Sequence, residues 1–313
     1  MKLRNSLFLL FLIYFLRASG TTPGNCKQIL TKWNNPGLEL SQTYQALEKA
    51  KIRIYYKFDY TVLATARLVS HMPIENIIKT HSQLSKLKLQ VYNDFDFTIL
   101  TLASAIKGVN SNTVANLFNE IVSEKLYLYN NYDFTLLTYA SIVSGLKPRK
   151  IAQVYRELQE SQISGLYGLH DLSILTISAA LDGGNQSSVK KVIDTHSELI
   201  KLKLRVYNEF DFAILTLAAV KFGKTANEIA EIHKAISAMK PPVYNVFDYT
   251  SLSFLAAAPG ESPESVVNLF QALKDKELKV YGLRDISVLA GAVVEVPEII
   301  FGYPTRRVSD DEF

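Results

Sequence analysis

Apolar residues recur through most of the chain at intervals of three and four positions, which is the spacing of one face of an α-helix. Residues 112–123 illustrate this pattern, because Val114, Leu117 and Ile121 fall on one side of the predicted helix. Residues 97–106 form another apolar run, and this one begins directly after an Asp. Segments of these two kinds alternate along the chain, so the pattern predicts an all-α fold made of paired helices.

A fixed motif marks each pair of helices: a Tyr, an Asp four positions later, and a Leu four positions after that. The Tyr positions are Tyr55, Tyr92, Tyr129, Tyr167, Tyr207, Tyr244 and Tyr281. The Asp positions are Asp59, Asp96, Asp133, Asp171, Asp211, Asp248 and Asp285. The Leu positions are Leu63, Leu100, Leu137, Leu175, Leu215, Leu252 and Leu289. Successive Asp residues lie 37 to 40 positions apart, so we predict an αα-repeat array of seven two-helix units, either an open solenoid or a closed α/α ring.

The repeated Asp suits the start of a helix, where a carboxylate accepts hydrogen bonds from free backbone N–H groups and is stabilised by the helix dipole. We therefore interpret all seven Asp residues as structural N-caps. A catalytic role is disfavoured, because seven equivalent groups lack the differing environments that acid–base catalysis needs. In five units an aromatic residue precedes the Asp and, with the fixed Leu, has the spacing of a hydrophobic staple. The repeated Tyr is expected to lie in the seam between units, with its hydroxyl hydrogen-bonded.

The pattern changes at two equivalent places. His170 and Arg284 stand directly before the Asp, where the other units carry an aromatic ring. Function in a repeat protein often lies where the pattern breaks, so both residues are candidates for contact with a partner. The sequence around them recurs after 114 positions, and His81 recurs as His196 after 115 positions. Copies two to four therefore match copies five to seven, as expected of a duplicated three-unit block.

The two ends of the chain differ from the repeated region. Lys2 and Arg4 precede an apolar run at residues 7–16, and small residues follow before Gly20. This layout is typical of a secretory signal peptide, and the apolar run is too short to span a bilayer. The predicted divisions are 1–20, a signal peptide; 21–37, a lead segment; 38–300, the helical-repeat domain; and 301–313, a polar tail. Residues 38–54 are expected to form an unpaired helix that caps the array.

The signals for location and charge follow from this division. The chain carries 34 Lys and Arg against 30 Asp and Glu, and loss of the signal peptide removes three of the basic residues. That near-balance does not favour nucleic acid or an anionic membrane as partner.

Cys26 is the single cysteine, so a disulfide there would be intermolecular. Asn185 begins a glycosylation sequon, and the final Asp-Asp-Glu-Phe resembles an endoplasmic reticulum retrieval signal. We expect a secreted or luminal protein.

Reactive motifs are few. The five His residues show no metal-binding spacing, and the sequence has no Gly-rich phosphate loop or nucleophile elbow. We therefore expect no catalytic residue, cofactor or metal. The first hypothesis is a non-enzymatic scaffold that binds a protein partner. One alternative is an α/α-ring enzyme acting on a glycan or polyprenyl substrate, with Glu295 and Glu298 as candidate carboxylates. Another is a luminal subunit of a membrane-bound complex.

Overall fold

The computed structural model describes residues 36–243, 245–275 and 282–293. These ranges contain 14 helices and no strand, so the all-α prediction is confirmed. The predicted signal peptide, the lead segment with Cys26, and the polar tail lie outside the described residues. Within the described ranges, none of the helices has the length and apolar character needed to cross a membrane.

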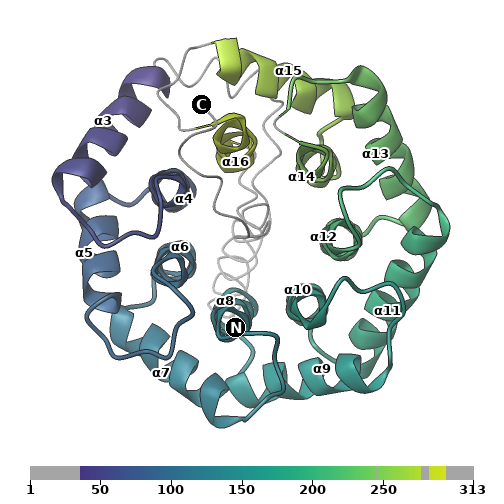
Figure 1. The fold of residues 1–313 in the computed structure, drawn as a ribbon, viewed down its shortest axis with the longest axis horizontal. Coiled ribbons are helices and arrows are strands. Elements are labelled where there is room, and N and C mark those ends of the chain that lie inside the picture. The colour runs from purple at the N-terminus through teal and green to yellow at the C-terminus, as the bar shows by residue number, and fades with distance from the viewer. Residues whose placement is uncertain (1–35, 244, 276–281, 294–313) are drawn as a thin grey trace, which may run out of the picture.

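The helices form two concentric layers (Figure 1). The inner helices are α4 (Phe58–Ser70), α6 (Phe95–Lys107), α8 (Tyr132–Ser144), α10 (Leu169–Leu181), α12 (Phe210–Phe222), α14 (Phe247–Ala256) and α16 (Leu283–Val293). The outer helices are α3 (Pro36–Lys49), α5 (Ile74–Leu84), α7 (Ser111–Ser123), α9 (Pro148–Glu160), α11 (Gln186–Lys201), α13 (Ala226–Met239) and α15 (Pro263–Asp275). Each inner helix therefore follows an outer helix in the chain.

The inner layer closes on itself. Each inner helix packs against the next one, and α16 packs against α4. Helix α3 was expected to cap the array alone, but it lies in the outer layer against α4 and α5. It therefore pairs with α4, so each helix pair consists of an outer helix followed along the chain by an inner helix.

Burial explains why the sequence forms two kinds of helix. In α12 every residue from Phe210 to Val220 is buried, because an inner helix has neighbours on nearly all sides. In α9 the buried residues recur at intervals of three and four, as expected of a helix packed on one face. The seven repeated Leu side chains are all 0% exposed. Burying one such side chain contributes about 1.5–3 kcal/mol to stability, so this position anchors every inner helix.

Two kinds of loop connect the layers. Loops from an outer to an inner helix comprise residues 50–57, 85–94, 124–131, 161–168, 202–209 and 240–246. Loops from an inner to an outer helix comprise residues 71–73, 108–110, 145–147, 182–185, 223–225 and 257–262. Contacts between the first turns of neighbouring inner helices, given below, show that these helices are parallel. Each kind of loop therefore gathers at one face of the ring. We name the first the tyrosine face and the second the opposite face.

Candidate functional site

The repeated Asp residues lie in the first turns of the inner helices, beneath the tyrosine face, and they are not the N-caps that were predicted. Asp96 is the second residue of α6, whose N-cap position is Asp94, and its carboxylate bonds to the loop residue Asn93. The backbone N–H of Phe95 donates to Asn93 Oδ1, and the backbone N–H of Asn93 donates to Asp96 Oδ2, both at 2.9 Å. This reciprocal pair resembles a capping box placed one residue before the N-cap, and it ties the loop to the first turn of α6.

The same correction applies around the ring. The same reciprocal bonds with an Asn three residues earlier recur at Asp133, Asp211 and Asp248. The carboxylates of Asp59 and Asp171 accept a backbone N–H from four residues earlier, and that of Asp285 one from three residues earlier. All seven carboxylates therefore reach back to the preceding loop, because a side chain in the first turn points towards the helix N-terminus. The sequence signal was Asn-x-x-Asp, which occurs in four units.

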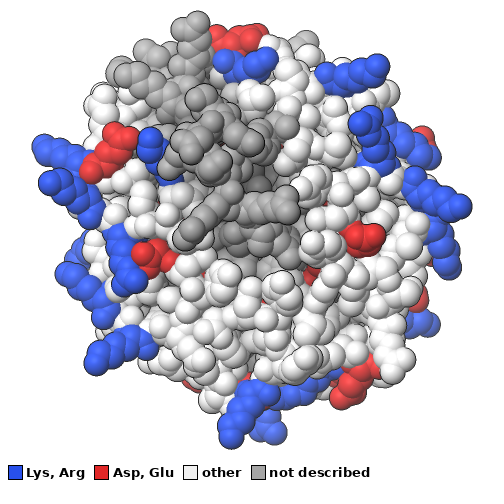
Figure 2. Space-filling view, in the orientation of Figure 1, with Lys and Arg blue, Asp and Glu red and all other residues white. Residues whose placement is uncertain are grey.

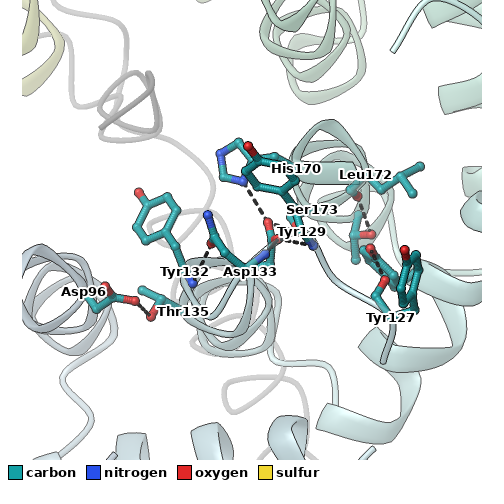
Figure 3. A network of polar contacts seen from close by, with 12 residues as sticks. Asp96, Tyr127, Tyr129, Tyr132, Asp133, Thr135, His170, Leu172 and Ser173 are labelled. Atoms are coloured by element: carbon teal, nitrogen blue, oxygen red, sulfur yellow. Dashed lines mark hydrogen bonds and ion pairs between the residues drawn. The ribbon is translucent and has the colours of Figure 1, made fainter. Parts of the chain in front are cut away.

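Four of these carboxylates, those of Asp59, Asp96, Asp133 and Asp248, also accept a hydroxyl of the next inner helix, as Figure 3 shows for Asp96 and Asp133. The hydroxyl of Thr98 donates to Asp59 at 3.2 Å, that of Ser173 to Asp133 at 2.8 Å, and that of Thr135 to Asp96. All seven Asp residues are at most 2% exposed. A carboxylate enclosed in this way holds two helices and a loop together, and it does not meet a substrate in solution.

The residues that precede the Asp form a chain of rings along the inner layer. Successive ring centroids lie 6.1 Å apart from Phe58 to Phe95 and 6.0 Å apart from Phe95 to Tyr132. The His170 ring then lies 5.5 Å from both Tyr132 and Phe210. These separations fall in the range of favourable aromatic contacts. The predicted staple placed the Phe and Tyr residues before the N-cap, but each is the first residue of its helix, and its ring contacts the equivalent ring of its neighbour.

His170 changes the chemistry of this inner layer at one place. Its Nδ1 atom lies 2.7 Å from Asp133 Oδ1, and its side chain is 4% exposed (Figure 3). Burial acts to raise the pKa of Asp133, but the hydrogen bond and charge of His170, with the hydrogen bond from Ser173, lower it below its usual value. The predicted partner contact of His170 stays a prediction, and the side chain of Arg284 is not described.

Four equivalent carboxyls behave in the opposite way. Burial raises the pKa of Asp59 to about 7, and those of Asp96, Asp171 and Asp211 to about 6. The backbone hydrogen bonds oppose this shift only in part, because burial penalises the charged form. Most of the carboxyls beneath the tyrosine face are therefore poised to take up protons near neutrality, and Asp133 is not.

Three further His residues are buried in the outer layer. They share one position with aromatic side chains on the other outer helices: Tyr44, His81, Phe118, Tyr155, His196, His233 and Phe270. His233 Nδ1 lies 3.0 Å from Ser253 Oγ, and its Nε2 lies 2.8 Å from the carbonyl oxygen of Arg205. Burial lowers the pKa of His81 and His196 to about 4. These side chains pack between the layers, and no group of metal-ligating residues occurs in the described ranges.

The repeated Tyr side chains are exposed, which corrects the prediction that they lie in a buried seam. The exposed fractions are 47% for Tyr55, 56% for Tyr92, 59% for Tyr129, 52% for Tyr167 and 61% for Tyr207. Tyr244 and Tyr281 lie outside the described residues. At Tyr129 it is the backbone N–H that bonds to Asp133, at 3.0 Å, while the ring points outward. The neighbouring Tyr127 is 74% exposed.

The loops alternate between inward and outward residues, which explains the exposure of the Tyr. In the first loop Lys51, Arg53 and Tyr55 are exposed, whereas Ile52 is buried and Ile54 partly buried. A period of two places the Tyr on the side of the charged residues. This signal was present in the sequence, but the helical period of the flanking segments obscured it.

The tyrosine face is also basic. Its Lys and Arg residues outnumber its Asp and Glu residues by nine to three in the described loops. The basic residues are Lys51, Arg53, Lys57, Lys86, Lys88, Lys125, Lys203, Arg205 and Lys240, and the acidic residues are Asp94, Glu124 and Glu209. On the side of the ring shown in Figure 2, Lys and Arg lie mainly around the rim. The near-neutral total of the predicted mature chain therefore hides an uneven distribution.

Comparison with known proteins gives no further lead. No protein-family model, curated protein or solved structure matches the chain.

Proposed function

We propose that the chain is a non-enzymatic scaffold, a closed ring of seven repeated helix pairs, and that it binds a protein partner through the tyrosine face. The observation that carries the proposal is the exposure of the five described Tyr side chains of the repeat. Tyr is enriched in protein interfaces, where its ring contributes contact area and its hydroxyl a hydrogen bond. Clustered exposure of large side chains commonly marks an interaction site.

The buried contacts beneath the tyrosine face favour a role in binding over a role in catalysis. The loops that carry the Tyr residues are fixed by buried Asp carboxylates, and these also bond to hydroxyl groups of the next helix. Side chains on loops fixed in this way lose less conformational freedom on binding, which raises affinity. One oxygen of each repeated carboxylate accepts a backbone N–H, whereas Oδ1 of Asp59, Asp171 and Asp211 has no hydrogen-bond partner among the described residues.

The proposed location is the exterior or the endoplasmic reticulum lumen, on the basis of the predicted signal peptide, sequon and terminal motif. Asn185 is exposed and caps α11, where its Oδ1 accepts the backbone N–H of Ser188 at 3.0 Å. This position is on the opposite face, so a glycan there leaves the tyrosine face uncovered. Expression in a eukaryotic secretory host should give a product that shrinks on deglycosylation, and Asn185→Gln should abolish the shift. A cytosolic product without the shift would remove this part of the proposal.

The main experiment compares two triple variants of the full chain. The first removes three exposed rings by Tyr92→Ala, Tyr129→Ala and Tyr207→Ala. The control changes the opposite half of the ring by Lys107→Ala, Lys147→Ala and Lys190→Ala, which are also exposed. After cross-linking in extracts of the source organism, mass spectrometry should find one partner with wild type and control. Its recovery should fall by about tenfold or more with the Tyr variant, because exposed aromatic anchors carry much of the binding energy. Equal recovery with all three proteins would refute the proposal.

One observation favours the enzyme as a second candidate. Asp133 and His170 have the composition of an acid–base pair, and the other described units lack it. The candidate residues Glu295 and Glu298 lie outside the described residues. If a turnover is found on a glycan or polyprenyl substrate, His170→Phe should abolish it, since Phe occupies this place in other units. The luminal-subunit hypothesis is tested by the same cross-linking in microsomes, where the partner should then be a membrane protein.

A further inference from the structure

We infer that the partner segment at the tyrosine face is an acidic stretch of protein, and that Lys residues in left-handed turns beside the Tyr rings bind it. This inference rests on the proposed function and specifies its chemistry. It follows from where the chain places Lys, from the balance of charge, and from the small number of carboxylates in the described loops.

The backbone of these Lys residues is unusual. Lys51, Lys125, Lys203 and Lys240 have φ values of 47°, 52°, 48° and 48°. Each follows the end of an outer helix, where a left-handed residue commonly terminates the helix and is usually Gly. A residue with a Cβ atom is strained in this region, whereas Gly is not. Four turns on the tyrosine face therefore contain Lys at positions that Gly would occupy at lower cost.

The turn itself does not require a Lys side chain. At Lys125 the backbone N–H donates to the carbonyl oxygen of Val122 at 3.2 Å, and at Lys240 to that of Ser237 at 3.4 Å. Any residue with an N–H makes this bond. The chain also uses Gly for the same conformation on the opposite face, with φ values of 65° at Gly108 and 74° at Gly145. The Lys side chain is therefore retained for something other than the turn.

Each such Lys stands four positions before a repeated Tyr. Lys51 and Tyr55 are both exposed, as are Lys125 and Tyr129. The alternation of the loop places residues four apart on the same side. Lys88 and Tyr92 repeat the arrangement without the left-handed turn, and Lys203 and Tyr207 repeat it with the turn. Each of these loops therefore offers an ammonium group and a phenol ring to the same solvent region.

The charge of this surface is not neutralised from within. Asp94 is already paired with Arg53 at 2.6 Å, and Glu124 with Arg156 at 2.9 Å. In the described part of the chain, Lys88, Lys125 and Lys203 make no ion pair with a carboxylate. On the opposite face the loops carry Lys147 and Lys224 against Asp182 and Glu261, which is an even balance. The described loops of the tyrosine face therefore carry a net positive charge, and those of the opposite face do not.

The mixture of cationic and aromatic side chains on the tyrosine face favours an acidic protein segment over other ligands. Neutral sugars need acceptors for their hydroxyl groups, and the described outward side carries few carboxylates. Nucleic acid and sulfated glycans need a dense cationic track, whereas here one or two cations per loop alternate with Tyr rings. Mixed aromatic and polar groups are typical of protein interfaces, in which charge mainly sets orientation and partner choice. An extended segment rich in Asp and Glu, with apolar residues between them, matches both components.

The test uses the full chain and a fluorescent 20-residue peptide of alternating Glu and Leu. A Lys and Leu peptide, a sulfated polysaccharide and single-stranded DNA serve as the other ligands. The test variant carries Lys125→Gly, Lys203→Gly and Lys240→Gly. The control variant carries Lys107→Ala, Lys147→Ala and Lys190→Ala, and it loses the same charge from the opposite half of the ring. Anisotropy gives the affinities, and thermal unfolding gives Tm.

We expect the acidic peptide to bind wild type and control alike and to bind the test variant about tenfold more weakly or worse. The Tm of the test variant should be equal to or above that of wild type, which a structural role for these Lys residues does not allow. The inference is overturned if the peptide fails to bind, if both variants lose affinity equally, or if the polysaccharide or DNA binds more tightly. Those outcomes leave the Tyr experiment standing, so the two failures are distinguishable.

Discussion

The loops on the two faces of the ring connect the same helices in different ways. On the opposite face the turns are short, their left-handed residues include Gly108, Gly145 and Gly223, and the charges balance. On the tyrosine face the loops are longer, and Lys takes four of the left-handed positions, with Gln162 and Gly165 taking two more. The opposite face shows what the architecture needs to connect its helices. The additional features of the tyrosine face, which turn chemistry does not require, are therefore the ones to assign to function.

The faces also differ in what fixes them. On the opposite face, exposed side chains such as Asn110 and Thr225 cap the outer helices by accepting the backbone N–H three residues ahead. Beneath the tyrosine face, buried carboxylates instead fix the starts of the inner helices by bonding to a loop and to the next helix. A buried ionisable group is costly unless its hydrogen bonds are satisfied. Loss of a carboxylate should therefore do more harm than loss of an exposed cap.

The largest effect is expected at Asp133. Asp133→Ala leaves His170 and the backbone N–H groups of Tyr129 and Asn130 buried without their acceptor. This should lower the free energy of unfolding by about 3–5 kcal/mol. Asn110→Ala on the opposite face removes one exposed cap and should lower it by about 1 kcal/mol. Urea unfolding of both variants measures the contrast, and equal losses would show that the faces are not fixed differently.

The next effect is on the pH dependence of stability, to which Asp59 and His196 contribute with opposite signs. Asp59 has a folded pKa of about 7 against a usual 3.8, so the folded state binds more protons between these values. Its contribution to stability therefore falls as pH rises from about 4 to 7. His196 has a folded pKa of about 4 against 6.5, so its contribution is present above pH 6.5 and is lost as pH falls towards 4.

Two variants separate these contributions. Relative to wild type, Asp59→Asn should become more stable as pH rises from 5 to 7.5, by on the order of 1 kcal/mol. His196→Phe, which copies the aromatic residue of other units, should become relatively more stable as pH falls from 7 to 5. Chemical unfolding at several pH values gives both differences. Parallel slopes for the two variants would mean that burial does not control these pKa values.

The helical content was predictable because it depends on local periodicity. The repeated Leu residues mark the inner helices, and all seven are buried. The starts of the outer helices were also readable, since Pro148 is the first residue of α9 and Thr225 caps α13. The inner helices begin before the Asp, because that carboxylate can bond backwards as well as forwards. Spacing alone could not choose between these two bonding directions.

The site was less predictable because its contacts join distant units. His170 stood out as a break in the pattern, but its partner Asp133 lies 37 positions away. The packing of α16 against α4 depends on the curvature of the whole array, which no single unit specifies. The exposure of Tyr129 depends on a short extended loop, whose period of two is easily lost between helices. These features follow from tertiary packing rather than from local propensity.

The smallest expected effect comes from exchanging Lys and Gly between left-handed positions of the two faces. Lys125 precedes α8 and Gly145 follows it, both with positive φ, and a Cβ atom built on Gly145 has no neighbour within 4 Å. Gly145→Lys should add about 1 kcal/mol of backbone strain without a steric clash but reduce the freedom of the unfolded chain, so it should destabilise by about 0.5 kcal/mol. Lys125→Gly relieves the same strain but increases the freedom of the unfolded chain, so it should stabilise by about 0.5 kcal/mol. Urea unfolding of the two variants should give shifts of opposite sign. Destabilisation by Lys125→Gly would instead make that Lys a structural part of the turn, and the two faces would then differ in sequence but not in purpose.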